Sequence, residues 1–239
     1  MIHFKNVSKS FGPKSVLNQV SFDVKAGEIL FILGKSGMGK SVTLKTIVGL
    51  LKADSGEVLL RDFKIHELGD EGLTEARKVC GMVFQHPALL DSLTIFENVS
   101  FGLRGMPTAR ARSRVIECLK LVHLDETILN RKPPEISYGM QKRVSLARTL
   151  APGPSCLLFD EPTTGLDPIT TNAINELIFE LSRTLKTTSL VVSHDMGCAL
   201  RIADRILVLD QGRILALGTI DEIRANPAQL IQDFLAEAI

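Results

Sequence analysis

The chain has 239 residues, 45% of them hydrophobic, and its 28 basic and 27 acidic residues leave a formal net charge of +1. That balance lacks the basic footprint of a nucleic-acid-binding protein, and no apolar run approaches the roughly 18 residues of a membrane span. The N-terminus shows no signal-peptide pattern, and the four cysteines are widely spaced without metal-ligand pairing, so we expect reduced thiols in a cytosolic protein.

The first part of the chain is predicted to be β structure that leads into a glycine-rich loop. Apolar and polar residues alternate across residues 1–33, and the apolar run 29–33 is typical of a buried strand. After the loop, the spacing of apolar residues from Leu44 to Leu51 predicts a helix. The elements predicted next are a turn at 54–56, a strand at 57–60, a helix at 72–79 and a strand at 79–84.

The middle of the chain is predicted to be helical. One helix is expected to begin at Ile95, and residues 110–121 have the pattern of a basic amphipathic helix. The arginines of this helix could suggest contact with RNA, but a solvated helix face is the favoured interpretation, because the chain as a whole is nearly neutral. Prolines 133–134 end this region, and Ser137 is a candidate N-cap for a helix over about 140–150.

Strands and helices alternate in the last third of the chain. The predicted elements are a buried strand at 156–161, a helix at 169–185, a strand at 190–194, a helix at 199–203, a hairpin of 205–209 and 213–217, and one or two helices within 221–239. Such alternation implies an α/β fold with a mostly parallel core sheet flanked by helices and with ligands at the carboxyl ends of its strands. The glycine-rich loop, the pair Asp160-Glu161 and His194 all follow predicted strands, so we expect them to converge on one edge.

The glycine-rich loop has the pattern G-x-x-x-x-G-K-S. Its residues are Gly34, Lys35, Ser36, Gly37, Met38, Gly39, Lys40 and Ser41. A strand before it and a helix after it are the context of a phosphate-binding loop, which disfavours the alternative of a turn with a chance lysine. Glycines let backbone N–H groups point at phosphate oxygens, Lys40 can reach the β- and γ-phosphates, and the Ser41 hydroxyl can ligate Mg²⁺.

The carboxylates that end the strand at 156–161 fit the same chemistry. Asp160 is suited to position Mg²⁺, and Glu161 to orient or deprotonate a water in line with the γ-phosphate. The alternative is an ordinary strand-ending turn at Asp-Glu-Pro. His194 can hold the attacking water and Gln85 can contact Mg²⁺ or water, although each alone is more often structural. Phe11 is left open between a surface residue at a loop tip and an aromatic platform for a nucleotide base.

Together these residues resemble the nucleotide-binding subunit of an ATP-binding cassette (ABC) transporter across essentially the whole chain. The matching positions are Phe11 for the base-stacking aromatic, 34–41 for Walker A, Gln85 for the Q-loop, 136–141 for the signature motif, Asp160 and Glu161 for Walker B and the catalytic glutamate, 165–167 for the D-loop, and His194 for the switch histidine. The resemblance implies one ABC-type P-loop domain over 1–239. Its core and N-terminal antiparallel β subdomain would span about 1–85 and 151–239, and an inserted α-helical subdomain about 86–150.

The resemblance also implies partners and a mechanism. Two copies would sit head to tail around two ATP molecules, each with Mg²⁺, and Ser137, Gly139 and Met140 of one copy would complete the phosphate site of the other. A related second subunit could take the place of the second copy. The subunit would lie on the cytoplasmic face of the inner membrane and drive permease subunits docked on the 86–150 lobe, with no nucleic-acid partner.

The signature motif departs from the usual family wording Leu-Ser-Gly-Gly-Gln. Tyr138 stands in place of the first glycine and Met140 in place of the glutamine. Methionine there, with residues 84–90, 139–143 and 165–170, resembles the Mla/Mce branch, whose transporters move phospholipids and maintain outer-membrane lipid asymmetry with a periplasmic lipid-binding (MCE) component. Phospholipid transport is therefore the first hypothesis.

Other functions remain as alternatives. The nearest is the ATPase of a small-solute importer, for example one for amino acids, and the permease that accompanies the chain would discriminate the two. A soluble ABC protein of ribosomes or DNA is disfavoured by the single cassette and the neutral charge. A regulatory module without hydrolysis is disfavoured by intact Lys40, Asp160, Glu161 and His194.

Overall fold

Two β-sheets organise the fold. The computed structural model describes residues 1–238 of the chain. Its strands are β1 (Ile2–Phe11), β2 (Lys14–Val24), β3 (Ile29–Leu33), β4 (Ser55–Leu60), β5 (Phe63–Lys64), β6 (Cys80–Val83), β7 (Cys156–Asp160), β8 (Thr188–Ser193), β9 (Arg205–Asp210) and β10 (Arg213–Gly218). The order of the antiparallel sheet is β2-β1-β4-β5, and that of the core sheet is β10-β9-β3-β8-β7-β6. Within the core sheet the pairs from β9 to β6 are parallel, and β10 pairs antiparallel with β9, so the expected α/β architecture is confirmed.

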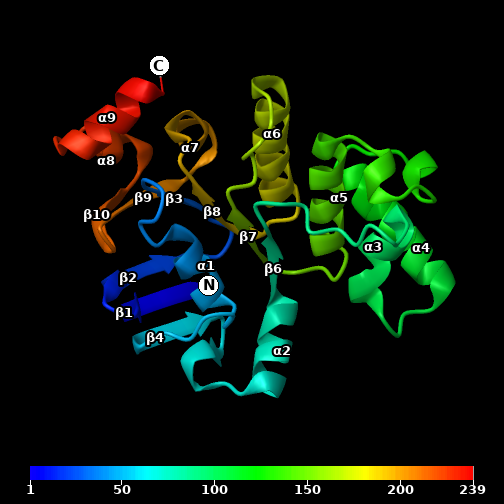
Figure 1. Ribbon diagram of the computed structural model, residues 1–239, viewed down its shortest axis with the longest axis horizontal. Coiled ribbons are helices and arrows are strands. Elements are labelled where there is room, and N and C mark those ends of the chain that lie inside the picture. Colours follow the sequence, from blue (N-terminus) through cyan, green and yellow to red (C-terminus); the bar gives the residue numbers. More distant parts are fainter. Residues whose placement is uncertain (239) are drawn as a thin grey trace.

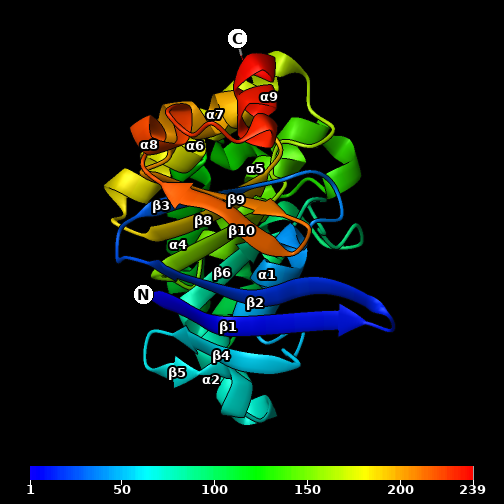
Figure 2. The same cartoon turned by 90° about the vertical axis from the view of Figure 1, so that its left-hand side faces the viewer.

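Helices cover both faces of the core sheet. They are α1 (Lys40–Ile47), α2 (Asp70–Val79), α3 (Ile95–Ser100), α4 (Thr108–Leu121), α5 (Tyr138–Leu150), α6 (Pro168–Thr184), α7 (Met196–Ile202), α8 (Ile220–Arg224) and α9 (Gln229–Glu237). Figure 1 shows α6 and α7 on one side of the core strands, α1 on the other, and α3, α4 and α5 grouped as a separate helical lobe. In Figure 2, α1 lies between the core strands and the antiparallel sheet.

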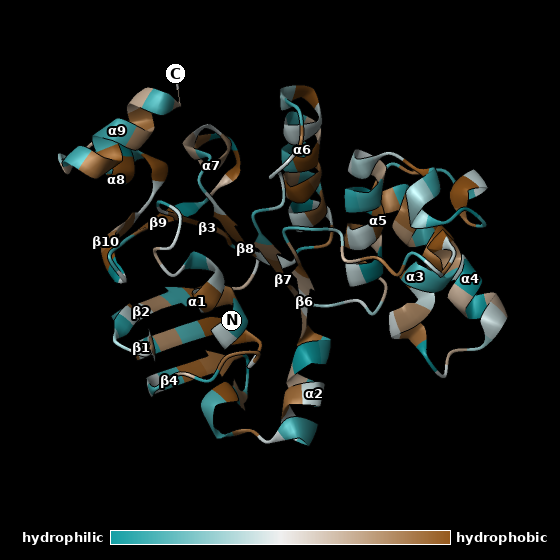
Figure 3. Ribbon diagram, in the orientation of Figure 1, coloured by the Kyte–Doolittle hydropathy of each residue, from teal (hydrophilic) through white to brown (hydrophobic). Residues whose placement is uncertain are grey.

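The alternation of side chains along the buried core strands produces two apolar cores. Leu30 and Ile32 of β3 face α1 and the antiparallel sheet. Phe31 and Leu33 belong to the second core, which includes side chains of α6, α7, α9 and the helical lobe. All of β3, β7 and β8 is buried, as expected of parallel strands covered on both faces. In Figure 3 the core strands are brown, whereas the helices carry both brown and teal residues, as expected of helices with one face on the core.

The helix after the glycine-rich loop is shorter than the sequence spacing predicts. It ends at Ile47, so the expected continuation to Leu51 is wrong. Gly49 adopts a φ of +64° and turns the chain out of the helix. The N–H groups of Leu50 and Leu51 then donate to the carbonyl of Lys45, at 2.8 and 3.2 Å.

Other boundaries shift by one to three residues, as is usual at element ends; α7, for example, begins at Met196 and not at residue 199. The turn predicted at 54–56 is partly wrong, because β4 already begins at Ser55, where Ser55 pairs with Ser8 of β1. The hairpin of β9 and β10 is confirmed: Gln211 and Gly212 have φ of +46° and +73°, the left-handed values that a tight hairpin turn requires. All four cysteines are free and buried. Residue 239 lies outside the described residues.

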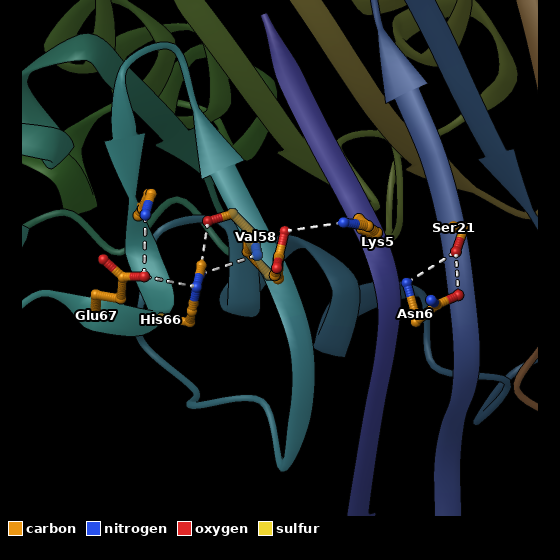
Figure 4. Close-up of polar contacts among 8 residues, drawn as sticks. Lys5, Asn6, Ser21, Val58, His66 and Glu67 are labelled. Carbon is orange, nitrogen blue, oxygen red and sulfur yellow. Dashed lines mark hydrogen bonds and ion pairs between the residues drawn. The ribbon is translucent and has the colours of Figure 1, made fainter.

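The antiparallel sheet contains a break in register that polar side chains stabilise. The pairing of β1 with β2 shifts between Phe4 and Val7, and Asn6 has a φ of +51°. Figure 4 shows that the Asn6 N–H donates to the Ser21 Oγ at 2.8 Å, while that hydroxyl donates back to the Asn6 side chain at 3.0 Å. These bonds satisfy the polar groups that the bulge removes from the strand ladder.

The helical lobe is closely packed. The amphipathic pattern predicted for the basic helix is confirmed: Val115, Leu119 and, just after the helix, Val122 are fully buried, and Ile116 is partly buried. Arg114, on the same helix, donates to the carbonyls of Leu150 and Ala151 at 2.9 and 3.0 Å and so attaches α4 to the end of α5. Throughout residues 1–238, no helix combines the length and apolar character needed to cross a membrane.

Candidate active site

The glycine-rich loop joins β3 to α1 at the carboxyl edge of the core sheet. Gly37 and Gly39 have φ of +80° and +98°, which few other residues adopt. A Cβ on Gly39 would also lie 2.7 Å from the carbonyl oxygen of Val16, so only glycine fits there. Helix α1 begins at Lys40, directly after the loop, and its N-terminal N–H groups provide the positive end that phosphates prefer.

Lys40 is folded over the loop that precedes it. It is 6% exposed, and its ammonium donates to the carbonyls of Gly34 and Lys35 at 2.7 and 3.2 Å. The same ammonium lies 3.4 Å from Oε1 of Glu161. A buried lysine held this way is a fixed positive charge within the loop.

Ser41 and Asp160 meet although 119 positions separate them in sequence. The Ser41 hydroxyl donates to Oδ1 of Asp160 at 2.6 Å, because α1 starts beside the end of β7. A hydroxyl and a carboxylate are the hard oxygen ligands that Mg²⁺ prefers. Within residues 1–238 no group of three or more His, Cys, Asp or Glu side chains forms a complete metal cluster. The pair therefore fits Mg²⁺ that shares its remaining coordination with phosphates and water, as Mg²⁺ usually does in nucleotide sites.

Glu161 follows the strand in a strained backbone conformation. Its φ is +47°, and its N–H donates to the carbonyl of Val192 at 3.0 Å. This turn aims the carboxylate between two partners, with Oε1 toward Lys40 and Oε2 only 2.8 Å from Nδ1 of His194. Non-glycine residues in left-handed conformations are often found at functional sites. The geometry fixes a carboxylate beside the phosphate loop with an exposed histidine as its neighbour.

Most of these residues line one cavity of about 770 Å³, whereas Asp160, which binds Ser41, is not part of its wall. Its walls are Val16, Lys35, Ser36, Gly37, Gly39, Lys40, Ser41, Val42, Gln85, Glu161, Thr164, His194, Phe234 and Glu237. Gln85, in the loop after β6, lines the same cavity as the glycine-rich loop, Glu161 and His194. The cavity is polar at the loop and open to solvent on its outer side.

Several cavity residues are not predicted by the sequence motifs. Thr164 lies 3.5 Å from the Glu161 carboxylate, and Phe234 and Glu237 come from α9 at the far end of the chain. The apolar spacing of α9 predicts that Phe234 is buried, but nothing local in the sequence indicates which cavity it faces. The only sequence feature that indicates a role for Thr164 is its position three residues after Glu161.

Other predicted site residues lie outside the cavity wall. The Gly34 carbonyl accepts a hydrogen bond from the Lys40 ammonium. The Met38 sulfur accepts the Gln211 N–H at 3.3 Å, beside the β9–β10 turn. Phe11 is 47% exposed at the end of β1, with the Lys9 ammonium 5.6 Å from its ring centre. The exposed position agrees with a loop-tip residue and equally leaves the ring free to stack on a base.

The signature residues lie on the helical lobe, also outside the cavity. Ser137 caps α5 as predicted, with its Oγ accepting the N–H of Met140 at 3.3 Å. Gly139 lies so close to α6 that a Cβ there would be 3.0 Å from Cγ2 of Thr170. The N-terminus of α5 therefore presents N–H groups that this chain's own cavity does not use.

The D-loop ends in a well-formed helix cap. Asp167 accepts the N–H groups of Ile169 and Thr170, both at 3.0 Å, and the Thr170 hydroxyl at 2.6 Å. These hydrogen bonds, the hydroxyl's first, lower the pKa of Asp167 below its ordinary value of 3.8. The carboxylate is thus ionised at neutral pH and stabilises the start of α6.

The parallel core sheet, the phosphate loop and the carboxylates at the ends of adjacent strands define a P-loop ATPase. The family profile described as "ABC transporter" matches residues 17–164. The chain belongs to the ABC transporter family and is an ATPase of that class.

Curated relatives are similar over nearly the whole chain. The methionine import ATP-binding protein MetN of Clostridioides difficile is 40% identical over 239 residues, which cover 99% of this chain and 74% of the relative. The protein of the same name from Caulobacter vibrioides is 40% identical over 232 residues, 95% of this chain and 70% of the relative. The alignment with the MetN protein of Brucella abortus covers 65% of that protein, so these relatives are longer than this chain.

Solved structures show the same fold. The ATP-binding cassette MJ0796, in a dimeric post-hydrolysis state bound to ADP and Pi, has a TM-score of 0.84 and 37% identity, covering 92% of this chain and 99% of its own. The cbiO1 protein of Clostridium perfringens, part of the ABC transporter complex cbiONQ, has a TM-score of 0.85 and 28% identity. That match covers 100% of this chain and 98% of cbiO1.

These relatives bear on the hypothesis drawn from the signature motif. They are methionine import proteins, so they favour the small-solute importer alternative over phospholipid transport. They give no support to an MCE component. The methionine at position 140 and the stretches shared with the Mla/Mce branch are therefore weak indicators of the substrate.

Proposed function

We propose that this protein is the ATP-hydrolysing subunit of an ABC importer for a small solute of the amino-acid class. The observation that supports this most is the 40% identity, over nearly the whole chain, to a protein named for methionine import. The proposed location is the cytoplasmic face of the cell membrane, where the subunit would be peripheral and attached to permease subunits.

The residues that the sequence motifs predict have proposed roles in hydrolysis. The loop of residues 34–41 binds the phosphates of ATP through backbone N–H groups, and Lys40 stabilises the charge on the transferring phosphoryl group. Mg²⁺ would be held by Ser41, Asp160 and Gln85, and would supply further positive charge at the phosphates. Glu161 accepts the proton of the attacking water, and His194, bonded to Glu161 at 2.8 Å, orients that carboxylate and the water.

The complete site requires a second copy of the chain. Ser137, Gly139 and Met140 lie at the N-terminus of α5, whose partial positive charge is not directed into this chain's cavity. In a head-to-tail dimer they would face the γ-phosphate bound by the partner. ATP would then hold the two copies together, and its hydrolysis would release them.

The helical lobe is the proposed docking surface for the permease. Residues 86–150 contain exposed apolar side chains, among them Leu90 and Phe101, at 44% and 46% exposure. Such side chains are common where a partner docks. Movement of this lobe with the Gln85 loop would transmit the ATP cycle to the permease. The division of the chain into a core and this lobe is part of the same proposal.

The experiment that tests the proposal is purification of the tagged chain from native membranes in mild detergent, with mass spectrometry of proteins and lipids. A multi-pass permease together with a solute-binding protein would support amino-acid import. Addition of methionine and the binding protein should then stimulate ATP hydrolysis by the purified complex. A Glu161→Gln complex is the matched control, because it should keep the same partners without hydrolysis.

Two other results would contradict the proposal. A permease with a periplasmic lipid-binding protein and bound phospholipid would move the assignment to lipid transport of the Mla/Mce type. Recovery with ribosomes or DNA, and without a membrane protein, would remove the chain from transport altogether.

A further inference from the structure

Tyr138 stands where ABC signature motifs usually have glycine, and its side chain lies at the meeting point of three segments. Its hydroxyl is 3.3 Å from Nδ1 of His86, in the loop after β6. Its ring centre is 5.6 Å from the ammonium of Lys142, one turn further along α5. On the D-loop side, a Cβ at Gly165 would lie 3.7 Å from the ring's Cε1. A glycine at position 138 would make none of these contacts.

The loop after β6 is fastened to α5 along its length. Lys142 is 3% exposed, and its ammonium donates to the carbonyl of Gln85. Arg148 donates to the carbonyls of Ala88 and Pro87, at 2.7 and 3.2 Å. The bond between His86 and Tyr138 adds a side-chain contact at the N-terminal end of the same helix. Burial lowers the pKa of both Lys142 and Arg148, in keeping with donors turned toward protein carbonyls and away from water.

The loop and the helix end face different nucleotides. The Gln85 side chain lines the cavity of its own chain. Ser137 and Gly139, on either side of Tyr138, belong to the helix end that would face the partner's γ-phosphate. Tyr138 is therefore placed to join the segment that contacts one ATP to the segment that contacts the other.

We propose that Tyr138 is a positioning residue that couples the two ATP sites of the dimer. Its hydroxyl bonds to His86 and fixes the Gln85 loop relative to the N-terminus of α5, so that both segments reach their phosphates together. Tyr138 itself touches neither nucleotide. The inference rests on the proposed hydrolysis in a dimer and is independent of which solute is transported.

The first test is the rate of ATP hydrolysis by the assembled complex. Tyr138→Phe removes only the hydroxyl, and the loss of one hydrogen bond should lower kcat by about two- to tenfold. The KM for ATP should not change, because the contacts of the phosphate loop remain. His86→Ala should have the same effect, and the double variant should be no slower than either single one, since both remove one bond.

Two further variants serve as controls for the rate measurement. Tyr138→Gly restores the glycine of the family and should change kcat by less than about tenfold, because Ser137 and Gly139 keep their backbone contacts. His3→Ala, on the exposed face of β1, is the matched histidine control and should leave kcat at the wild-type value.

The second test uses a spectroscopic property of this sequence. The chain contains one tyrosine and no tryptophan, so its tyrosine fluorescence comes from Tyr138 alone. The emission of a phenol depends on its hydrogen-bond partner. In the isolated full chain, Mg²⁺-ATP is expected to change this emission, because binding at the phosphate loop should move the Gln85 loop that carries His86. His86→Ala should alter the emission without ATP and remove the change on adding Mg²⁺-ATP, whereas His3→Ala should behave as the wild type.

The outcomes separate this inference from the proposed function. A reduced kcat with unchanged KM, non-additive single variants and an altered emission would support the coupling role. Additive effects, a wild-type rate in Tyr138→Phe, or an emission that His86→Ala leaves unchanged would overturn it. A wild-type complex without ATPase activity would instead contradict the proposed function, while the emission of the isolated chain would still report on the contact with His86.

Discussion

At the scale of single residues, Glu161 combines a strained backbone with two charged or polar neighbours. Its φ of +47° directs one carboxylate oxygen toward Lys40 and the other toward His194. Glu161→Gln keeps the shape of the side chain and removes the proton acceptor. We expect kcat of the assembled complex to fall by about 10²–10⁴-fold, with ATP binding retained. Steady-state hydrolysis and nucleotide binding, measured on the same preparation, check this; near-normal turnover would rule out Glu161 as the base.

Gly39 gives a second residue-scale prediction, because both its φ of +98° and its packing require glycine. In Gly39→Ala the new methyl group would lie 2.7 Å from the Val16 carbonyl and displace the phosphate loop. We expect the affinity for ATP to fall by about tenfold or more, which corresponds to about 1.4 kcal/mol. Isothermal titration of the purified chain measures this.

The matched control for that variant is Gly105→Ala. Gly105 has a similar φ of +86°, and no atom lies within 4 Å of the place where its Cβ would be. Gly105→Ala should therefore cost about 1–2 kcal/mol of stability through the backbone alone and leave ATP affinity unchanged. Equal losses of affinity in both variants would show that general destabilisation of the fold, and not displacement of the phosphate loop, is responsible.

Motif reasoning works at this scale where the chemistry fixes both residue type and spacing. The convergence of the phosphate loop, the pair Asp160-Glu161 and His194 on one edge could be predicted, because parallel strands bring their carboxyl ends together. Gln85 was not part of that prediction, although it lines the same cavity. The direct bond between His194 and Glu161 could not be predicted, since it depends on the left-handed turn at Glu161. The turn itself has no sequence signal, because glutamate rarely adopts it.

At the scale of elements, N-cap residues mark where several helices begin, although only Ser137 was predicted as a cap from the sequence. Ser137, Asp167 and Thr219 cap α5, α6 and α8 with the hydrogen bonds expected of N-cap residues. The C-terminal end of α1 was predicted wrongly for a local reason. Leu51 continues the helical spacing of apolar residues, but Gly49 ends the helix before it. Apolar spacing alone does not contain that information.

The capping box of α8 gives a prediction of pH dependence. Glu222 accepts the N–H of Thr219 at 2.7 Å, and this bond, followed by that of the Thr219 hydroxyl, lowers the pKa of Glu222 below its ordinary value of 4.5. Since the folded pKa is depressed, the stabilisation is present above pH 4.5 and is lost as pH falls through the lowered pKa. Glu222→Gln removes this charge.

The expected result is a difference in unfolding free energy that depends on pH. The wild type should be more stable than Glu222→Gln near neutral pH, and the two should converge in acid. Urea denaturation at a series of pH values measures the difference. Glu97→Gln, in the equivalent capping box of α3, should show the same trend, because the Thr94 N–H lowers the pKa of Glu97 in the same way. A difference that grows as pH falls would contradict the assignment.

At the scale of the whole molecule, the residues proposed to form the site come from two parts of the chain. The core sheet provides the phosphate loop, Asp160, Glu161 and His194, and the helical lobe provides the signature residues on α5, outside the cavity (Figure 1). The sequence predicts this division through its resemblance to a family, since composition and periodicity alone give the elements and not their assembly. The position of α9, whose Phe234 and Glu237 reach the cavity, was not predicted, because it depends on packing against α7 and the core.

Association of two copies around ATP is tested most directly by the mass of the Glu161→Gln chain in solution, measured by light scattering with and without Mg²⁺-ATP. This variant should bind ATP without consuming it. We expect twice the mass of one chain with Mg²⁺-ATP and the mass of a single chain with Mg²⁺-ADP. A single-chain mass at ATP concentrations that saturate the phosphate loop would contradict a site shared between two copies.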